Sequence, residues 1–227
     1  MQTNILFSQR PENYNHYLHD LQRAKHSYKD SSKYFIGFDV LKACIDEPSL
    51  TVGYNITNRH SITFSLGYTY RNQILRPLVV GISPSQDTDP ILPYNGPTLR
   101  TGYNFRIISF LRVGADFFYK DLYYNNVDFY DSEGDQGDLR YTRSEKAQAF
   151  GWHINSGLMI NLSKVFYFNP SLAMGQTFKH RTYTTSNVTE YRMTPVPEGT
   201  FSKEQKYFSM MLSANFGVKF GQLKNHH

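Results

Sequence analysis

The sequence is poor in cysteine, in charge and in long apolar runs. Its single cysteine, Cys44, excludes an intramolecular disulfide and a cysteine-rich metal site. No stretch approaches the roughly 18 consecutive apolar residues that a membrane-spanning helix needs. Charged residues make up 19% of the 227 residues, and the formal charge of +5 is spread along the chain. We therefore expect no nucleic-acid partner.

Aromatic residues are abundant at 16%, and many lie in segments where apolar and polar residues alternate. In the stretch YFSMMLSANFGVKFGQ, every second residue from Phe208 to Phe220 belongs to one apolar face. Such alternation is typical of a β-strand with two different faces. The same pattern predicts eight strands, at residues 34–43, 49–56, 60–72, 98–107, 110–122, 147–162, 165–182 and 207–222.

The connections between these predicted strands are unequal in length. Those after the second, fourth and sixth strands are tight turns, whereas residues 73–97, 123–146 and 184–205 form long connections. Tight turns on one rim and long loops on the other are typical of an outer-membrane barrel. The predicted fold is therefore all-β: an eight-stranded, antiparallel, up-and-down transmembrane β-barrel over residues 33–222.

The position of glycine indicates which face of the strands is outside. Nine of the fifteen glycines fall on the polar face and none on the apolar face. On the outside of a soluble barrel each would weaken its strand by about 0.5–1 kcal/mol, whereas a narrow barrel interior needs small residues beside large ones. The apolar face then points into lipid. The polar face becomes an interior polar network, which we expect to contain Asp39, Arg71, Arg100, Arg106, Arg112, Asp116, Lys179 and Arg181.

These segments resemble the small eight-stranded outer-membrane barrels of the OmpA-barrel and OmpX kind. The phrases GYNITNRHSITFSLGYTY and SANFGVKFG are similar to Bacteroidota members of that group. The resemblance covers residues 34–221 and implies the outer membrane of a Gram-negative bacterium, with outer-membrane lipid and lipopolysaccharide around the barrel. It also implies that the barrel-assembly machinery reads the last strand, where Phe216, Val218 and Phe220 match the family signal, although seven residues follow Phe220.

The residues outside the barrel show a different pattern. Residues 1–32 are expected to be a periplasmic extension, either flexible or a short amphipathic helix, and residues 223–227 a tail. The segment YNHYLHDLQRAKHSYK has an apolar stripe at helical spacing that could dock on another envelope protein: Tyr14, Tyr17, Leu18, Leu21 and Tyr28. The start, MQTNILFSQRPENYN, lacks the apolar core of a secretory signal, so we expect that the signal has been removed.

No pattern predicts a metal, a cofactor or a catalytic group. His16 and His19 have helical spacing without a third ligand, and the acidic residues 128–138 lack the glycine and closing glutamate of a calcium loop. Lipid A-modifying barrels often use a His and a Ser two residues apart, and the chain has no H-x-S; His153 has no evident nucleophile and His180 no Ser or acid two residues away. An enzyme is therefore not expected.

Two binding roles remain open. The first is a structural or accessory subunit of a larger outer-membrane complex for secretion or assembly, for which a filled eight-stranded interior and the N-terminal stripe are suited. The second is a surface adhesin that binds a ligand through its long loops. The aromatic residues that would then form the binding surface are Tyr123, Tyr124, Phe129, Tyr130, Tyr141 and Tyr191.

Overall fold

The computed structural model describes residues 32–44, 47–70, 94–132, 138–190 and 198–222, and these residues are almost entirely β-strand. A single short helix, α2, lies among the strands. The elements are β1 (Ser32–Asp39), α2 (Val40–Cys44), β2 (Ser49–Asn55), β3 (His60–Thr69), β4 (Gly96–Arg106), β5 (Leu111–Ser132), β6 (Asp138–Leu158), β7 (Ile160–Asn161), β8 (Phe166–Glu190) and β9 (Gly199–Gln222). No helix within these ranges is long and apolar enough to cross a membrane.

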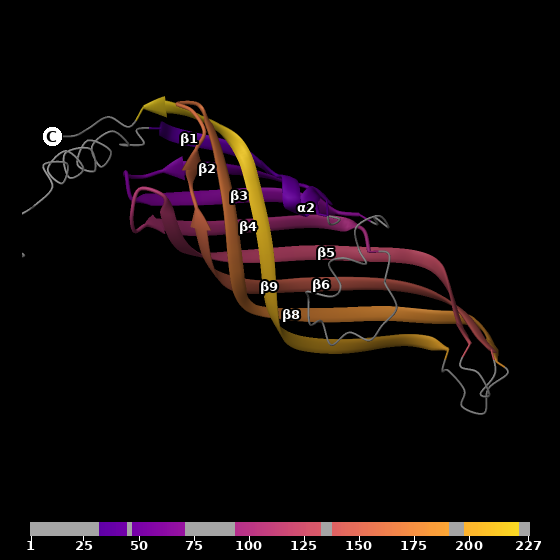
Figure 1. Cartoon of the computed structure of the whole chain (residues 1–227). Coiled ribbons are helices and arrows are strands. Elements are labelled where there is room, and N and C mark those ends of the chain that lie inside the picture. Colours follow the sequence, from indigo (N-terminus) through magenta and orange to yellow (C-terminus); the bar gives the residue numbers. More distant parts are fainter. Residues whose placement is uncertain (1–31, 45–46, 71–93, 133–137, 191–197, 223–227) are drawn as a thin grey trace, which may run out of the picture.

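The strands form one antiparallel sheet that closes into a ring. The sheet order is β6-β5-β4-β3-β2-β1-β9-β8-β7, and an additional pairing of β6 with β8 joins its two ends. The two-residue β7 follows β6 after Met159 and also pairs with β8. Figure 1 shows the strands curling around a common interior, with the C-terminal end of β9 beside β1.

Four strands continue well beyond the ring. The last residue of β1, Asp39, is paired with Asn215, and the ladder between β4 and β5 ends at Thr98 and Lys120. Beyond these points β5, β6, β8 and β9 continue as a four-stranded sheet, which we call the extension (Figure 1). The prediction of long loops at 123–146 and 184–205 was therefore largely wrong, because β5 reaches Ser132 and β8 reaches Glu190.

The first predicted strand, 34–43, was also too long. It ends at Asp39, whose carboxylate accepts a hydrogen bond from the backbone N–H of Lys42, 3.1 Å away. This is the N-cap arrangement that begins a helix, and the chain turns into α2 at this point. The helix takes the place of a longer β1 and carries the chain over to β2.

The two faces of the ring have opposite chemistry. The face that points away from the ring is apolar and exposed; Phe117 and Ile154, for example, are each 63% exposed. The opposite face points into the ring and carries buried charges; Asp39, for example, is only 1% exposed and Asp116 only 5%. The buried charges of the ring therefore lie on the polar face of its strands, opposite the exposed apolar side chains.

Glycines on the inner face allow the strands to come together closely. A Cβ atom built on Gly217 would overlap the backbone oxygen of Ile36 on β1, and one on Gly175 would overlap the backbone oxygen of Trp152 on β6. Because these obstacles are backbone atoms, no side chain fits at either position. The interior therefore has room for long polar side chains on some strands only because others contribute none.

Candidate functional site

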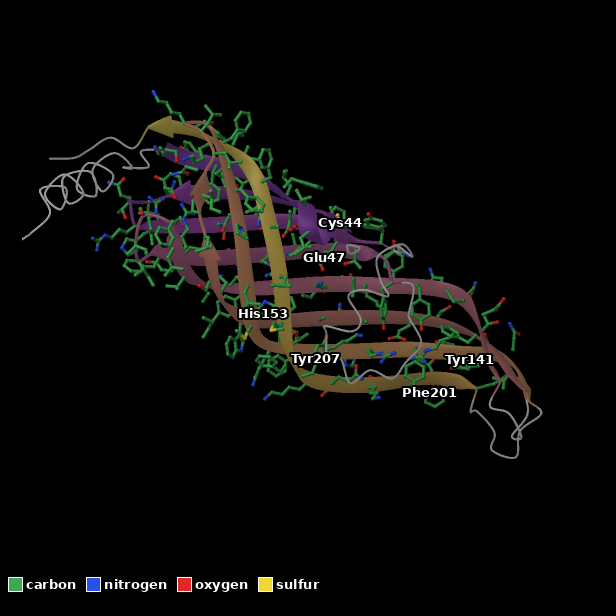
Figure 2. The ribbon with its side chains drawn as sticks, viewed as in Figure 1. Cys44, Glu47, Tyr141, His153, Phe201 and Tyr207 are labelled. Atoms are coloured by element: carbon green, nitrogen blue, oxygen red, sulfur yellow. The ribbon has the colours of Figure 1, made fainter. Side chains whose placement is uncertain are left out.

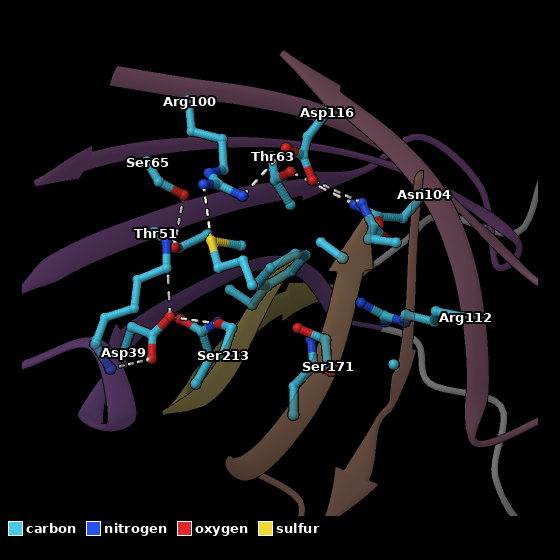
Figure 3. A pocket seen from close by; sticks show the side chains of 18 of the residues that line it. Asp39, Thr51, Thr63, Ser65, Arg100, Asn104, Arg112, Asp116, Ser171 and Ser213 are labelled. Atoms are coloured by element: carbon cyan, nitrogen blue, oxygen red, sulfur yellow. Dashed lines mark hydrogen bonds and ion pairs between the residues drawn. The ribbon is translucent and has the colours of Figure 1, made fainter. Parts of the chain in front are cut away.

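The interior network has a hub at Asp39, at the end of β1. Its carboxylate accepts hydrogen bonds from the Lys42 backbone N–H, the Ala214 backbone N–H at 3.1 Å and the Ser213 hydroxyl. The Lys42 ammonium lies 3.9 Å away (Figure 3). One buried carboxylate therefore caps α2 and also satisfies a backbone donor of β9 beyond the last β1 pairing, which ties the helix to the seam of the ring.

A second part of the network is centred on Asp116 of β5. Arg100 donates to its Oδ1 at 3.1 Å, and Asn155 donates to its Oδ2 at 3.0 Å. The Nδ1 atom of His153 lies 3.4 Å from Oδ1, and the Nε2 atom of the same ring lies 2.8 Å from the Ser209 hydroxyl. The statement that His153 has no evident nucleophile nearby was therefore wrong, because β9 brings a serine to it from 56 residues away.

A small cavity lies between these two groups. It has a volume of about 90 Å³ and is lined by Asp39, Lys42, Arg100, Asp116, Met211 and Ser213 among others (Figure 3). Ligand pockets usually measure about 300–1,000 Å³, so this cavity suits a few water molecules. Within the described ranges, no group of three or more His, Cys, Asp or Glu side chains could hold a metal ion.

At the mouth of the ring, Glu47 lies between two lysines. Lys120 forms an ion pair with one carboxylate oxygen, and Lys42 lies 3.9 Å from the other. Burial alone would raise the pKa of Glu47, but the two lysines outweigh it and lower that pKa to about 2. Burial and Arg100 lower the pKa of Lys42 to about 8, although Glu47 and Asp39 act in the opposite direction.

Glu47 is expected to make the folded state sensitive to acid. Because its pKa falls from 4.5 to about 2 on folding, the unfolded chain binds the extra proton in this range. The resulting stabilisation, of about 3 kcal/mol, is complete above pH 4.5 and is lost as the pH falls toward 2. Denaturant midpoints measured across this range should fall steeply for the wild type and less for Glu47→Gln.

The matched control for that measurement is Glu204→Gln. Glu204 is 88% exposed, and the contact described for its carboxylate is with His180, at 3.7 Å. Such a pair contributes little to stability, so the control should keep the wild-type pH dependence. An unchanged acid transition in Glu47→Gln would contradict the assignment.

The extension has its own buried ion cluster, centred on Glu145 of β6. Arg181 and Arg143 donate to its Oε2 atom at 3.1 and 2.8 Å, and the Tyr124 hydroxyl donates to the same atom at 2.9 Å. The Tyr94 hydroxyl and a second Arg181 nitrogen bind Oε1. Burial would raise the pKa of Glu145, but Arg181 and Tyr94 hold it below its usual value. The carboxylate is thus charged and fully engaged.

An aromatic surface crosses the extension beside this cluster. Phe129 of β5 stacks on Tyr141 of β6 with ring centroids 5.2 Å apart. Farther across, the Arg143 guanidinium lies 3.9 Å from the ring centre of Tyr183, which contacts Phe201 of β9 at 5.5 Å. Figure 2 shows Tyr141 on β6 and Phe201 on β9, both toward the far end of the extension. Of the predicted loop aromatics, Tyr124, Phe129 and Tyr141 meet here, and Tyr191 lies outside the described residues.

Most of the predicted interior network lies inside the ring, but it is divided. Asp39, Arg100, Arg112 and Asp116 line the cavity, whereas Arg181 belongs to the Glu145 cluster and Lys179 lies 4.9 Å from the ring centre of Tyr94. Arg106 pairs with Arg112 in the ladder between β4 and β5. Arg71 lies outside the described residues. Sequence reasoning missed Lys42, Glu47 and Glu145. Glu47 and Glu145 each have a partner from a distant strand, Lys120 and Arg181, whereas Lys42 pairs with acids within five residues of it.

The other predicted sites lie at or beyond the ends of the described chain. Phe216, Val218 and Phe220 lie on the outer face of β9, each paired with a residue of β1. The N-terminal stripe of Tyr14, Tyr17, Leu18, Leu21 and Tyr28 lies outside the described residues. His180, which has no Ser or acid nearby in sequence, lies 3.4 Å from Ser202 and 3.7 Å from Glu204 of β9.

Comparison with known proteins identified no relative of this chain. The chain matches no protein-family model, no curated protein and no solved structure at a significant level. The geometry of the ring and its extension is therefore the basis on which a function is proposed.

Proposed function

We propose that this chain is an eight-stranded outer-membrane β-barrel of a Gram-negative bacterium, similar to the OmpA-barrel and OmpX proteins, that acts as a structural or accessory subunit of a larger envelope complex. The observation that carries the proposal is the inverted chemistry of the ring: exposed apolar side chains all around the outside and buried ion pairs inside. In water this arrangement would leave the apolar surface uncovered, whereas lipid would cover it.

The dimensions of the apolar belt support a membrane position. On β6 and β7 the outward apolar residues run from Phe150 to Ile160. At about 3.3 Å per residue and a tilt of about 40°, this run covers about 25 Å, the height of the apolar band of an outer-membrane barrel. Ring closure supports it too, because an open sheet edge in hydrocarbon would leave backbone polar groups unpaired.

The filled interior supports a structural role in preference to transport. Charges inside the ring are held by one another, as in the pairs Arg100–Asp116 and Lys120–Glu47. The cavity among them holds only about 90 Å³. We therefore expect this chain to act by binding other molecules, through its outer face, its extension or its N-terminal segment.

The test is extraction of native envelopes in mild detergent, followed by native-size separation and mass spectrometry. The full chain is expected to migrate with larger partners, and a chain without residues 1–30, which leaves β1 intact, should lose them. The control is the pair Phe129→Ala and Tyr141→Ala, which alters the extension and should retain the partners. A lone species in every sample would contradict the accessory role.

A second candidate function is adhesion, which the extension favours. Its aromatic surface, Phe129, Tyr141, Tyr183 and Phe201, lies on strands that project past the ring. Aromatic residues with a neighbouring arginine are typical of binding hot spots. In this case the Phe129→Ala and Tyr141→Ala pair would abolish binding of an external ligand, and removal of residues 1–30 would not.

A further inference from the structure

From the row of residues that crosses β5, β6, β8 and β9 we infer a nucleophilic serine site: Ser209 as nucleophile, His153 as general base and Asp116 as the group that orients the histidine, acting on carboxylic esters. This inference goes beyond the proposed function and does not depend on it. It also departs from the expectation, drawn from the sequence, that the chain has no enzymatic chemistry.

The register of the sheet places the three residues in one line. Asp116 is paired with His153, His153 with Gly175, and Gly175 with Ser209. Gly175 places no side chain between His153 and Ser209, and a Cβ there would overlap the backbone oxygen of Trp152. His153 thus spans from Asp116 on one side to the Ser209 hydroxyl, 2.8 Å from Nε2, on the other.

The hydrogen bonds around the line allow proton transfer from Ser209 to His153. Thr177 donates to the Ser209 oxygen at 2.8 Å, which leaves the Ser209 O–H available to donate to Nε2 of His153. In the site that we infer, Nε2 accepts this bond and Nδ1 carries the ring proton, 3.4 Å from the Asp116 carboxylate. This is the tautomer that a serine nucleophile requires, with the carboxylate behind the imidazole.

The histidine and the carboxylate are held in place by their neighbours. His153 is 3% exposed and stacks on Phe118, with ring centroids 4.8 Å apart and an interplanar angle of 19°. Asp116 is fixed by Arg100 and Asn155 on its two oxygens. Ser209, in contrast, is partly exposed. The base and its orienting group are therefore rigid, and the nucleophile is the member that a substrate can reach.

The β9 backbone supplies a candidate donor for the oxyanion. Backbone N–H groups of alternate residues in a strand point to the same edge. Since the Ala214 N–H points to Asp39 at the seam, the Met210 N–H points to this edge as well. No described strand pairs with β9 at Met210 on that side, because β1 ends opposite Asn215. The N–H after a nucleophilic serine is a common oxyanion donor.

The proposed hydrolysis needs only the ester, water and the residues of the site. Ser209 attacks the ester carbonyl while its proton passes to His153, and the C–O bond breaks as the alcohol leaves with that proton. Water then attacks the acyl-serine with the same base, releasing the carboxylic acid and restoring the serine. The nearby cavity of about 90 Å³, which Asp116 and Met211 line, suits such water.

The test uses the purified full chain, folded in detergent, with diisopropyl fluorophosphate as the probe and peptide mass spectrometry as the readout. Ser209 is expected to be labelled at least about 100-fold faster than Ser65, an interior serine of β3 without a histidine beside it. Urea should abolish the difference. p-Nitrophenyl acetate should be hydrolysed by the wild type and by Ser65→Ala, but not by Ser209→Ala.

His153→Gln separates a base from a structural contact. It keeps a polar side chain in the row but cannot take the proton, so labelling of Ser209 should fall to the Ser65 rate while the protein stays folded. If His153→Gln fails to fold, the labelling of Ser209 relative to Ser65 in the folded wild type decides. Labelling of Ser209 at the Ser65 rate in the folded wild type would overturn the inference.

Discussion

Replacing Glu145 by glutamine is expected to destabilise the fold by about 3–5 kcal/mol, the usual cost of removing one partner from a buried ion pair. Arg181, which is 1% exposed, and Arg143 would both lose the Glu145 carboxylate as an ion-pair partner. Two tyrosine hydroxyls also donate to this carboxylate. The measurement is denaturant unfolding in detergent, followed by the fluorescence of the single tryptophan, Trp152.

The control for this prediction is Glu204→Gln on β9, whose carboxylate is exposed. It should change the unfolding free energy by less than about 0.5 kcal/mol. The double variant Glu145→Gln with Arg181→Met should recover part of the loss, since it also removes the buried cation that Glu145 balances. A loss below about 1 kcal/mol for Glu145→Gln alone would mean that the extension is not packed as described.

Asp39→Ala is the second large effect, with an expected loss of at least about 3 kcal/mol. It removes the cap of α2 and leaves the buried Ser213 hydroxyl and the Ala214 N–H without their acceptor. It also removes a counter-charge from Lys42, which is buried. Asp39→Asn should lose less, because the amide oxygen can still accept the backbone N–H groups.

Amide hydrogen exchange would show which part of the fold Asp39→Ala destabilises. In Asp39→Ala the amides of Lys42 and Ala214 should exchange faster, while those of the ladder between β5 and β6 stay protected. Asp128→Ala provides the control, because that carboxylate is exposed and its one described partner is the Thr142 hydroxyl. Equal protection at Lys42 in the wild type and in Asp39→Ala would contradict the capping role.

The orientation of the two faces was predictable because it follows from the alternation of residue types along each predicted strand. Glycines and charges shared one face of each predicted strand, and the buried positions of Asp39 and Arg181 agree with that. The extension was not predictable in the same way. Beyond the apolar belt both faces of β8 are polar, as in Thr182 to Thr185, so the alternation that indicates a strand disappears there.

The site residues were harder to predict because register decides which of them meet. Asp116, His153 and Ser209 lie on three strands, and a shift of one residue in any of the ladders would turn a side chain to the other face. A search for His and Ser close in sequence cannot detect such a row. The sequence did contain one relevant signal, Gly175. A glycine within a strand indicates that another part of the backbone approaches closely, and a Cβ atom at this position would overlap the backbone oxygen of Trp152.

The central claim, that the apolar face of the ring lies in lipid, is tested most directly by Trp152. This residue is the single tryptophan of the chain, and it points outward from β6 between Phe150 and Ile154. The chain is reconstituted into vesicles of ordinary or tail-brominated lipid, and its fluorescence is measured with and without aqueous acrylamide. The matched control, Trp152→Phe with Tyr141→Trp, moves the reporter to the extension.

If the proposal is right, brominated tails quench Trp152 strongly, acrylamide does so weakly, and the tryptophan at position 141 shows the reverse. Quenching of Trp152 by acrylamide but not by brominated lipid would place the apolar face outside the bilayer and contradict the account.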